Sequence, residues 1–172
     1  MFKKTIFLSF FFLSFFSFSQ ENEFNSVLNN ISSEIKTVQN SKSSFSQTIT
    51  SEQLGVILFH STETTSKGKT KKNTYQLNFS DIDINTIRPI TNKDIIMVQM
   101  IVKNNQKMIK KTEDDTKISF ENKIFILADN IDNARILTDL LKQISPISNK
   151  ITENRLSLSG YEDRLEWLEK NI

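Results

Sequence analysis

Residues 74–80 read Thr-Tyr-Gln-Leu-Asn-Phe-Ser, and this stretch decides the fold class. Tyr75, Leu77 and Phe79 alternate with polar residues, which is the period of a β-strand with one face on a core and the other in water. A period of two recurs across residues 44–128, where polar turns separate six or seven apolar segments. Short connections favour antiparallel pairing, because parallel strands need a crossover helix between them. The sequence therefore predicts an antiparallel six- to seven-stranded sheet or partly open barrel.

Helical periodicity flanks this sheet. Residues 22–38 and 130–145 each place an apolar residue every three or four positions, which predicts an amphipathic helix. Asp129 or Asn130 is expected to cap the second of these helices. Pro146 disfavours helical geometry at the residue before it, so that helix is expected to end at residue 145. The chain thus belongs to the α+β class, with a helix capping the sheet.

A last helix is expected over residues 160–172, after a connector over 147–158. Ser159 followed by Glu162 forms a capping box, in which each side chain satisfies a backbone N–H of the first helical turn. Trp167 lies nearly opposite the apolar stripe of this helix. It either packs into a second surface or stands exposed as a contact for a partner.

The N-terminus has the pattern of a secretory signal peptide. Lys3 and Lys4 precede an apolar run over residues 5–18, and cleavage is expected between Ser19 and Gln20. The run is shorter than the ~20 residues that a membrane-spanning helix needs, and no later stretch approaches that length. Residues 20–172 are therefore expected to form one exported domain, periplasmic or extracellular, without a membrane span after cleavage.

Composition excludes several classes of function. Without the two signal lysines the chain has 20 basic and 20 acidic residues, so it has no net charge that would attract nucleic acid. The absence of cysteine excludes disulfide bonds and lipid attachment at cysteine. Glycines occur only at positions 55, 68 and 160, which leaves no glycine-rich loop for a nucleotide phosphate.

The residues that could carry catalysis or bind a metal are sparse. His60 is the only histidine, no thiol exists, and neither a nucleophile–base pair nor a zinc ligand set is recognisable. Asp81 and Asp83 share one face of a stretch expected to be extended, and residues 113–115 form an acidic turn. Both groups are interpreted as solvated turn acids. We therefore expect no catalytic, metal or cofactor-binding residues.

The strongest local charge feature is a lysine-rich segment around Gly68, expected at the tip of a hairpin. It could meet an acidic protein or an envelope polymer, or it could be a solvated loop that blunts edge pairing. Its lysines are Lys67, Lys69, Lys71 and Lys72.

The arrangement of elements resembles the pleckstrin-homology-like domain of uncharacterised exported bacterial proteins, over residues 44–147. The segments that carry the resemblance are Thr74–Asp83, Ile95–Val102, Met108–Lys111, Ile118–Ala128 and Ile131–Ile144. The resemblance implies about seven antiparallel strands and one capping helix. Cytoplasmic members often bind phosphoinositides through basic residues between their first two strands. Residues 50–54 contain no lysine or arginine, so this function is not carried over.

These features favour an exported, non-enzymatic binding or scaffold module of the bacterial envelope, whose partner is an unknown protein or polymer. One alternative is a carboxylate-based hydrolase acting on envelope polymers, which needs two facing acids in a cleft. Another is a self-assembling structural protein, since an exposed stripe on a terminal helix could drive a homodimer.

Overall fold

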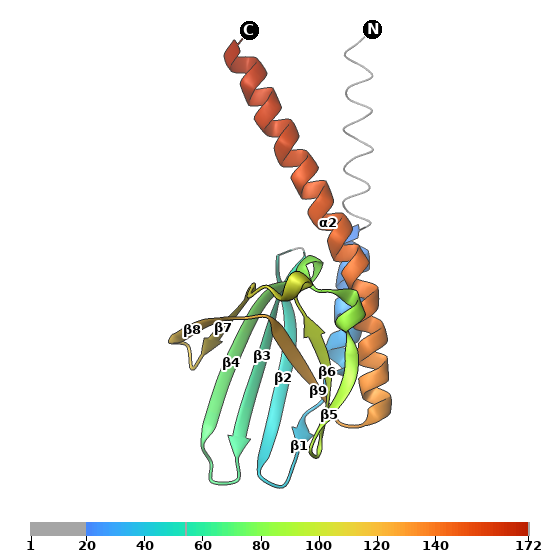
Figure 1. The fold of residues 1–172 in the computed structure, drawn as a ribbon, viewed down its shortest axis with the longest axis vertical. Coiled ribbons are helices and arrows are strands. Elements are labelled where there is room, and N and C mark those ends of the chain that lie inside the picture. The colour runs from blue at the N-terminus through green and yellow to red at the C-terminus, as the bar shows by residue number, and fades with distance from the viewer. Residues whose placement is uncertain (1–19, 54, 172) are drawn as a thin grey trace.

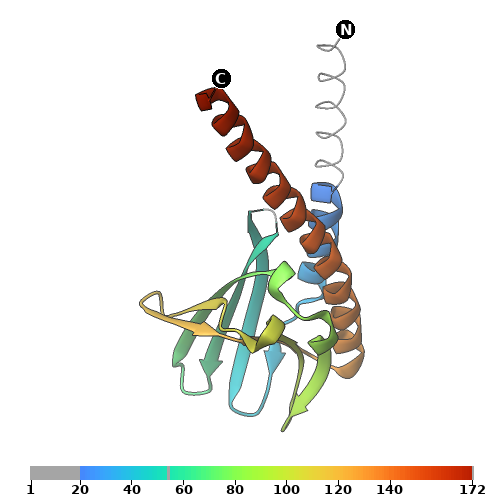
Figure 2. The same ribbon diagram turned by 45° about the horizontal axis from the view of Figure 1, so that its top comes forward.

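The computed structural model describes residues 20–53 and 55–171, and it describes side chains except at residue 53 and from residue 155 onward. The signal segment predicted for residues 1–19 lies outside this part. The fold is α+β: antiparallel strands are covered by a helix over residues 20–34 and by helix α2 (Ile131–Asn171). The two helices lie side by side (Figures 1 and 2). The predicted antiparallel sheet capped by a helix is confirmed.

The strands of the described residues form two sheets (Figure 1). The six-stranded sheet runs in the order β1 (Val38–Gln39), β2 (Ser43–Gln53), β3 (Val56–Thr65), β4 (Thr70–Asn78), β7 (Ile109–Glu113) and β8 (Lys117–Glu121). The three-stranded sheet runs in the order β5 (Arg88–Asn92), β6 (Ile95–Ile101) and β9 (Lys123–Ala128). Short 3-10 helices connect the strands: η1 (Phe79–Asp81), η2 (Ile84–Thr86) and η3 (Lys103–Asn105).

The part of the chain that the structure describes has nine strands, more than the six or seven predicted. The additional ones are short and carry little alternation. Strand β1 has two residues, and β5 contains Pro89, which lacks a backbone N–H and therefore suits the edge position that β5 occupies. Strand β6, which lies within the segment Ile95–Val102, is at the centre of the smaller sheet, between β5 and β9.

One hydrophobic core joins both sheets to both helices. The helix over residues 20–34 contributes Phe24 and Ile31, the large sheet contributes Ile57 and Phe59, and α2 contributes residues such as Leu137. The core of the described residues extends from residue 24 to residue 151. The described residues of this core therefore all lie in the part of the chain that starts at Gln20.

Helix α2 is continuous from Ile131 to Asn171, so the predicted end at residue 145 and the separate helix over 160–172 are wrong. Pro146 lies inside the helix, where it removes one backbone hydrogen bond at a cost of about 3 kcal/mol. Ile147 and Ile151 follow it and are only 7% and 3% exposed. Fully burying each such side chain stabilises the fold by about 1.5–3 kcal/mol, which offsets the proline.

The helix beyond Pro146 packs against the turn between β2 and β3. Gly55 has a φ of +86°, and a Cβ there would lie 3.5 Å from Ser148 Oγ and 3.7 Å from Ile151 Cγ2. The Ser148 hydroxyl donates to Asn78 Oδ1 over 3.1 Å. Ile147, Ser148 and Ile151, which lie in the expected connector, are thus part of the packed structure.

The N-terminal helix ends at residue 34, earlier than the predicted residue 38. Asn133 of α2 donates to the backbone oxygen of Glu34 over 2.9 Å, which satisfies a carbonyl at the helix end. Val38 is buried instead in β1, opposite Phe45 of β2. Asn130 Oδ1 accepts the N–H of Asn133 over 2.9 Å, which confirms the predicted cap of α2.

The stretch expected to be extended through Asp83 leaves the sheet at Asn78. The Asn78 side chain accepts the N–H of Ser80 over 3.0 Å and starts η1, which contains Asp81. Asp83 in turn caps η2. The two acids therefore do not lie on one strand face. None of the helices in residues 20–53 and 55–171 is long and apolar enough to cross a membrane.

The β7–β8 turn contains two residues in the left-handed region, Asp114 at a φ of +46° and Asp115 at +60°. Two positive φ values are typical of a type I′ turn, which favours glycine. We expect Asp115→Gly to raise the free energy of unfolding by about 0.5–1 kcal/mol in urea titrations. Asp114→Gly should gain less, because Asp114 Oδ1 accepts the N–H of Lys72 over 2.9 Å. An equal gain at both positions would contradict this account.

Candidate ligand-binding cleft

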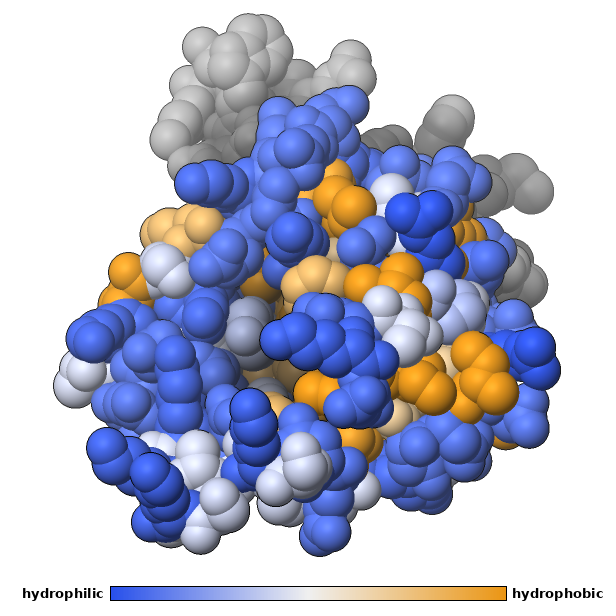
Figure 3. Space-filling view, turned by 60° about the horizontal axis from the view of Figure 1, so that its bottom comes forward, coloured by the Kyte–Doolittle hydropathy of each residue, from blue (hydrophilic) through white to orange (hydrophobic). Residues whose placement is uncertain are grey.

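An open cleft of about 300 Å³ lies between the six-stranded sheet and strand β9. Small-molecule sites have volumes of about 300–1,000 Å³, so the cleft is at the small end of that range. Its apolar lining consists of Phe45, Phe59, Tyr75, Ile124, Phe125 and Leu127. Its polar lining consists of Ser61, Lys111, Glu121 and Lys123. Seen from the end that carries the β3–β4 turn, apolar residues lie in a recess between hydrophilic ones (Figure 3).

Strand register brings one wall of the cleft together. Phe59 of β3 lies opposite Tyr75 of β4, and Tyr75 lies opposite Lys111 of β7, so the three side chains share one sheet face. The Phe59 and Tyr75 ring centroids are 6.0 Å apart. The Lys111 ammonium lies 5.9 Å from the Tyr75 ring centroid. This wall is an aromatic surface with a cation at its edge, and it forms the floor of the cleft.

The other wall is strand β9, which Gln47 holds against the inner face of the large sheet. Gln47 is 7% exposed, and its Oε1 accepts the N–H of Leu127 over 2.8 Å. Its Nε2 donates to the carbonyl of Leu127 over 3.0 Å and to that of Lys36 over 3.3 Å. The side-chain amide thus makes the two backbone hydrogen bonds that a neighbouring strand would otherwise make at the free edge of β9. On the same strand, the Lys123 ammonium lies 5.7 Å from the Phe125 ring centroid.

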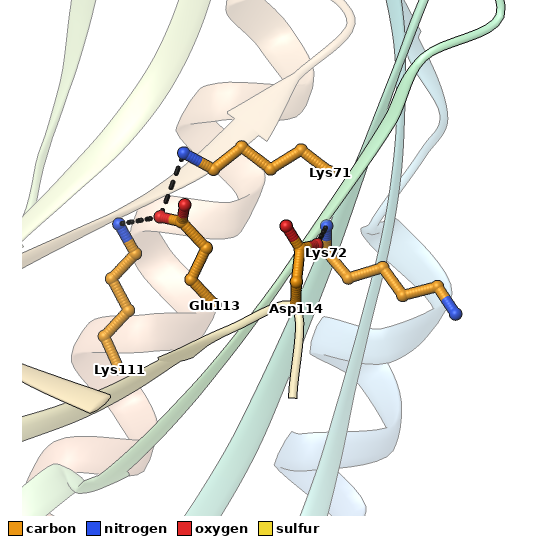
Figure 4. A network of polar contacts seen from close by, with 5 residues as sticks. All are labelled: Lys71, Lys72, Lys111, Glu113 and Asp114. Atoms are coloured by element: carbon orange, nitrogen blue, oxygen red, sulfur yellow. Dashed lines mark hydrogen bonds and ion pairs between the residues drawn. The ribbon is translucent and has the colours of Figure 1, made fainter. Parts of the chain in front are cut away.

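A small charge network borders the cleft (Figure 4). Lys71 Nζ lies 2.9 Å from Glu113 Oε2, and Lys111 Nζ lies 3.9 Å from the same oxygen. The bond to Lys71 lowers the pKa of Glu113 and raises the pKa of Lys71. Glu113 therefore stays ionised, and its charge is shared by two lysines.

Burial raises the pKa of the Tyr75 hydroxyl, and the charges of Glu121 and Glu113 raise it further. Desolvation penalises the charged form of a phenol, so Tyr75 stays neutral at physiological pH. The floor of the cleft is therefore a partly desolvated, uncharged aromatic surface, and the formal charges lie around it.

The predicted lysine-rich hairpin tip is present, but its lysines do not act as one group. Gly68, with a φ of +77°, lies in the turn between β3 and β4, and Lys71 and Lys72 belong to β4. Figure 4 shows the side chains of Lys71 and Lys72 leaving the strand in opposite directions. Lys71 is engaged by Glu113 at the cleft. Lys67 and Lys69 lie in and beside the turn, exposed to solvent.

The structure places His60 away from the cleft lining. His60 lies opposite Thr74, and its Nδ1 is 3.0 Å from Thr74 Oγ1, which accounts for its polar contact. Within residues 20–53 and 55–171, no three His, Cys, Asp or Glu residues gather in a way that could hold a metal ion. Asp81 has its pKa raised by burial, against the lowering effect of Lys103, and does not line the cleft. The Trp167 side chain lies outside the described part of the chain.

Sequence reasoning did not find the cleft. Phe45, Phe59, Tyr75 and Phe125 each follow a strand pattern that is typical of core residues. The cleft is lined by strands that are distant in sequence, and the periodicity of a single strand contains no information about how such strands pack.

Comparisons with protein-family models, with curated proteins and with solved structures found no match for this chain. The fold and the cleft define an α+β protein with an aromatic-lined recess.

Proposed function

We propose that the protein is an exported, non-enzymatic binding module of the bacterial envelope, and that the cleft holds the apolar part of a small amphiphilic ligand. The observation that carries the proposal is the aromatic floor of an open cavity of about 300 Å³. Ligand sites are mostly apolar and contain a few convergent polar groups, as here. The signal pattern of residues 1–19 supports export.

The charges around the cleft favour an acidic head group on the ligand. Three lysines and two glutamates lie in or beside it: Lys71, Lys111, Lys123, Glu113 and Glu121. Lys71 and Lys111 share the charge of Glu113, and the three lysines still outnumber the two glutamates by one. A carboxylate near these ammonium groups would gain a charge-assisted hydrogen bond.

The hydrolase alternative finds less support in the same residues. Glycoside hydrolysis needs one carboxyl group with a raised pKa as the acid, next to an ionised one. The Lys71 ammonium lowers the pKa of Glu113. Asp81, whose pKa is raised, does not line the cleft. Binding without chemistry is therefore the better account of the cleft.

Filling the cleft, or removing apolar surface from it, should weaken ligand binding. We expect Ser61→Phe, which fills the space, and Phe125→Ser, which removes apolar surface, each to weaken binding of a neutral naphthylamine probe at least tenfold. Each buried CH₂ group of a ligand contributes about 0.8 kcal/mol, so a lost aromatic contact has a large effect. Probe fluorescence, titrated against protein, measures the affinity.

Ile136→Ser provides the control, because Ile136 is an exposed apolar residue of α2 that does not line the cleft. It should leave probe affinity unchanged. Decanoate should displace the probe at lower concentration than decyltrimethylammonium. Equal probe affinity in Ser61→Phe, Phe125→Ser and the unmodified chain would rule out the cleft as the binding site.

A further inference from the structure

Strand β8 is an edge strand with an unusual surface. It is last in the order of the six-stranded sheet and pairs with β7 alone within the described residues. Ile118 and Phe120 on this strand are 61% and 54% exposed. Figure 2 shows the β7–β8 hairpin standing out from the body of the molecule. An exposed edge with apolar side chains is a template for pairing with another strand.

The sequence of β8 is complementary to itself. It reads Lys117-Ile118-Ser119-Phe120-Glu121. When a second copy is laid antiparallel with Ser119 opposite Ser119, each Lys117 faces a Glu121 and each Ile118 faces a Phe120. Opposite charges and apolar–aromatic pairs facing each other directly are the combinations that stabilise a sheet.

We propose that β8 pairs with β8 of a second copy, joining two six-stranded sheets about a twofold axis through Ser119. The interface is isologous, so each favourable pair occurs twice. The charges of β8 favour a second copy as the partner, because Lys117 and Glu121 at the two ends of the strand each face an opposite charge in the same arrangement.

Only one register gives this match. A shift by one residue would place the exposed apolar side chains against the other sheet face. A shift by two residues keeps the faces but breaks the pairing of Lys117 with Glu121 at both ends of the strand. The charges therefore specify the register as well as the partner.

The proposed interface lies next to the cleft, but dimerisation does not require a ligand. Glu121 lines the cleft, and Lys117 and Ser119 lie on the same face of β8 as Glu121, because alternate residues of a strand share a face. The dimer would bring Lys117 of the second copy to the rim beside Glu121. An interface made by one short strand is small, so we expect a weak dimer that forms at high protein concentration.

Charge reversal tests the pairing. On the chain from Gln20, sedimentation across a concentration series should show a monomer–dimer equilibrium. Lys117→Glu and Glu121→Lys should each weaken dimerisation about tenfold or more, because each places like charges opposite each other twice. Combining both substitutions should restore dimerisation. A monomer at all concentrations, unchanged association in the single variants, or no recovery in the double variant would overturn the proposal.

A cysteine at the axis gives an independent readout. Directly opposed residues of antiparallel strands have Cα atoms about 4.5–5.5 Å apart, within the disulfide range. The chain has no other cysteine. The Ser119→Cys variant should therefore form a disulfide-linked dimer under mild oxidation at least tenfold faster than Ser66→Cys, placed in the exposed β3–β4 turn. Equal rates in the two variants would refute the twofold axis.

Discussion

Replacement of Ile151 by alanine is expected to lower the free energy of unfolding by about 2–4 kcal/mol. Ile151 is 3% exposed and belongs to the core, and its Cγ2 lies 3.7 Å from the position of a Cβ on Gly55. Truncating a buried isoleucine removes apolar burial and leaves a cavity beside the β2–β3 turn. Urea unfolding of the chain from Gln20, followed by circular dichroism, measures the loss.

Lys150→Ala is the matched control, since Lys150 is exposed and adjacent on the same helix. It should change the free energy of unfolding by less than about 0.5 kcal/mol. The comparison separates the two accounts of this segment. If residues 147–158 were a connector, both substitutions would be nearly neutral. An Ile151→Ala variant as stable as Lys150→Ala would therefore contradict the continuous helix.

Local patterns predicted most strands because the residues report directly on their own surroundings. Tyr75 and Leu77 alternate with polar neighbours since one face of β4 contacts the core. The run that forms β6 is nearly continuous since none of its side chains is exposed on either face. Strand β4 ends earlier than its alternation predicts, because a polar side chain starts a 3-10 helix there. Asn78 caps η1 through its own Oδ1, and the alternation that continues to Phe79 does not reveal this.

Helix α2 was mispredicted because the local cost of a proline in a helix is outweighed by burial against residues that are distant in sequence. The cost of Pro146 is intrinsic to the backbone and readable from the sequence. The burial of Ser148 and Ile151 depends on where the β2–β3 turn lies in space. The spacing of Ile144, Ile147 and Ile151 is helical, and it is the signal that could have predicted the helix beyond the proline.

The cleft and the β8 edge differ in what sequence could reveal. The mirrored charges of Lys117 and Glu121 are visible in the sequence, but only the topology shows that β8 lies at an edge. The cleft requires more, because its walls come from strands that are distant in sequence. Gln47 and Leu127 join those walls, and a polar residue in an alternating strand gives no indication of its distant partner.

Gln47→Leu is expected to lower the free energy of unfolding by about 2–4 kcal/mol and to weaken ligand binding in the cleft. The change leaves the N–H and the carbonyl of Leu127 without the amide that satisfies them. Each buried backbone group that loses its partner costs about 1–3 kcal/mol. Without that bridge β9 is no longer held against the inner sheet face, so the two walls of the cleft separate.

Gln76→Leu is the control, because the Gln76 amide donates to Glu52 at an exposed site. It should have a small effect on the free energy of unfolding.

The Gln47→Glu variant gives a second test, through the pH dependence of stability. An ionised carboxylate accepts from the Leu127 N–H but cannot donate to the carbonyl, and burial raises its pKa above the unfolded value. The folded variant then binds the proton more tightly, so its stability should approach that of the unmodified chain in acid and be lost as pH rises through the folded pKa. A Gln47→Glu variant whose deficit is the same at pH 4 and pH 8 would show that the donated bond to Leu127 does not hold the two sheets together.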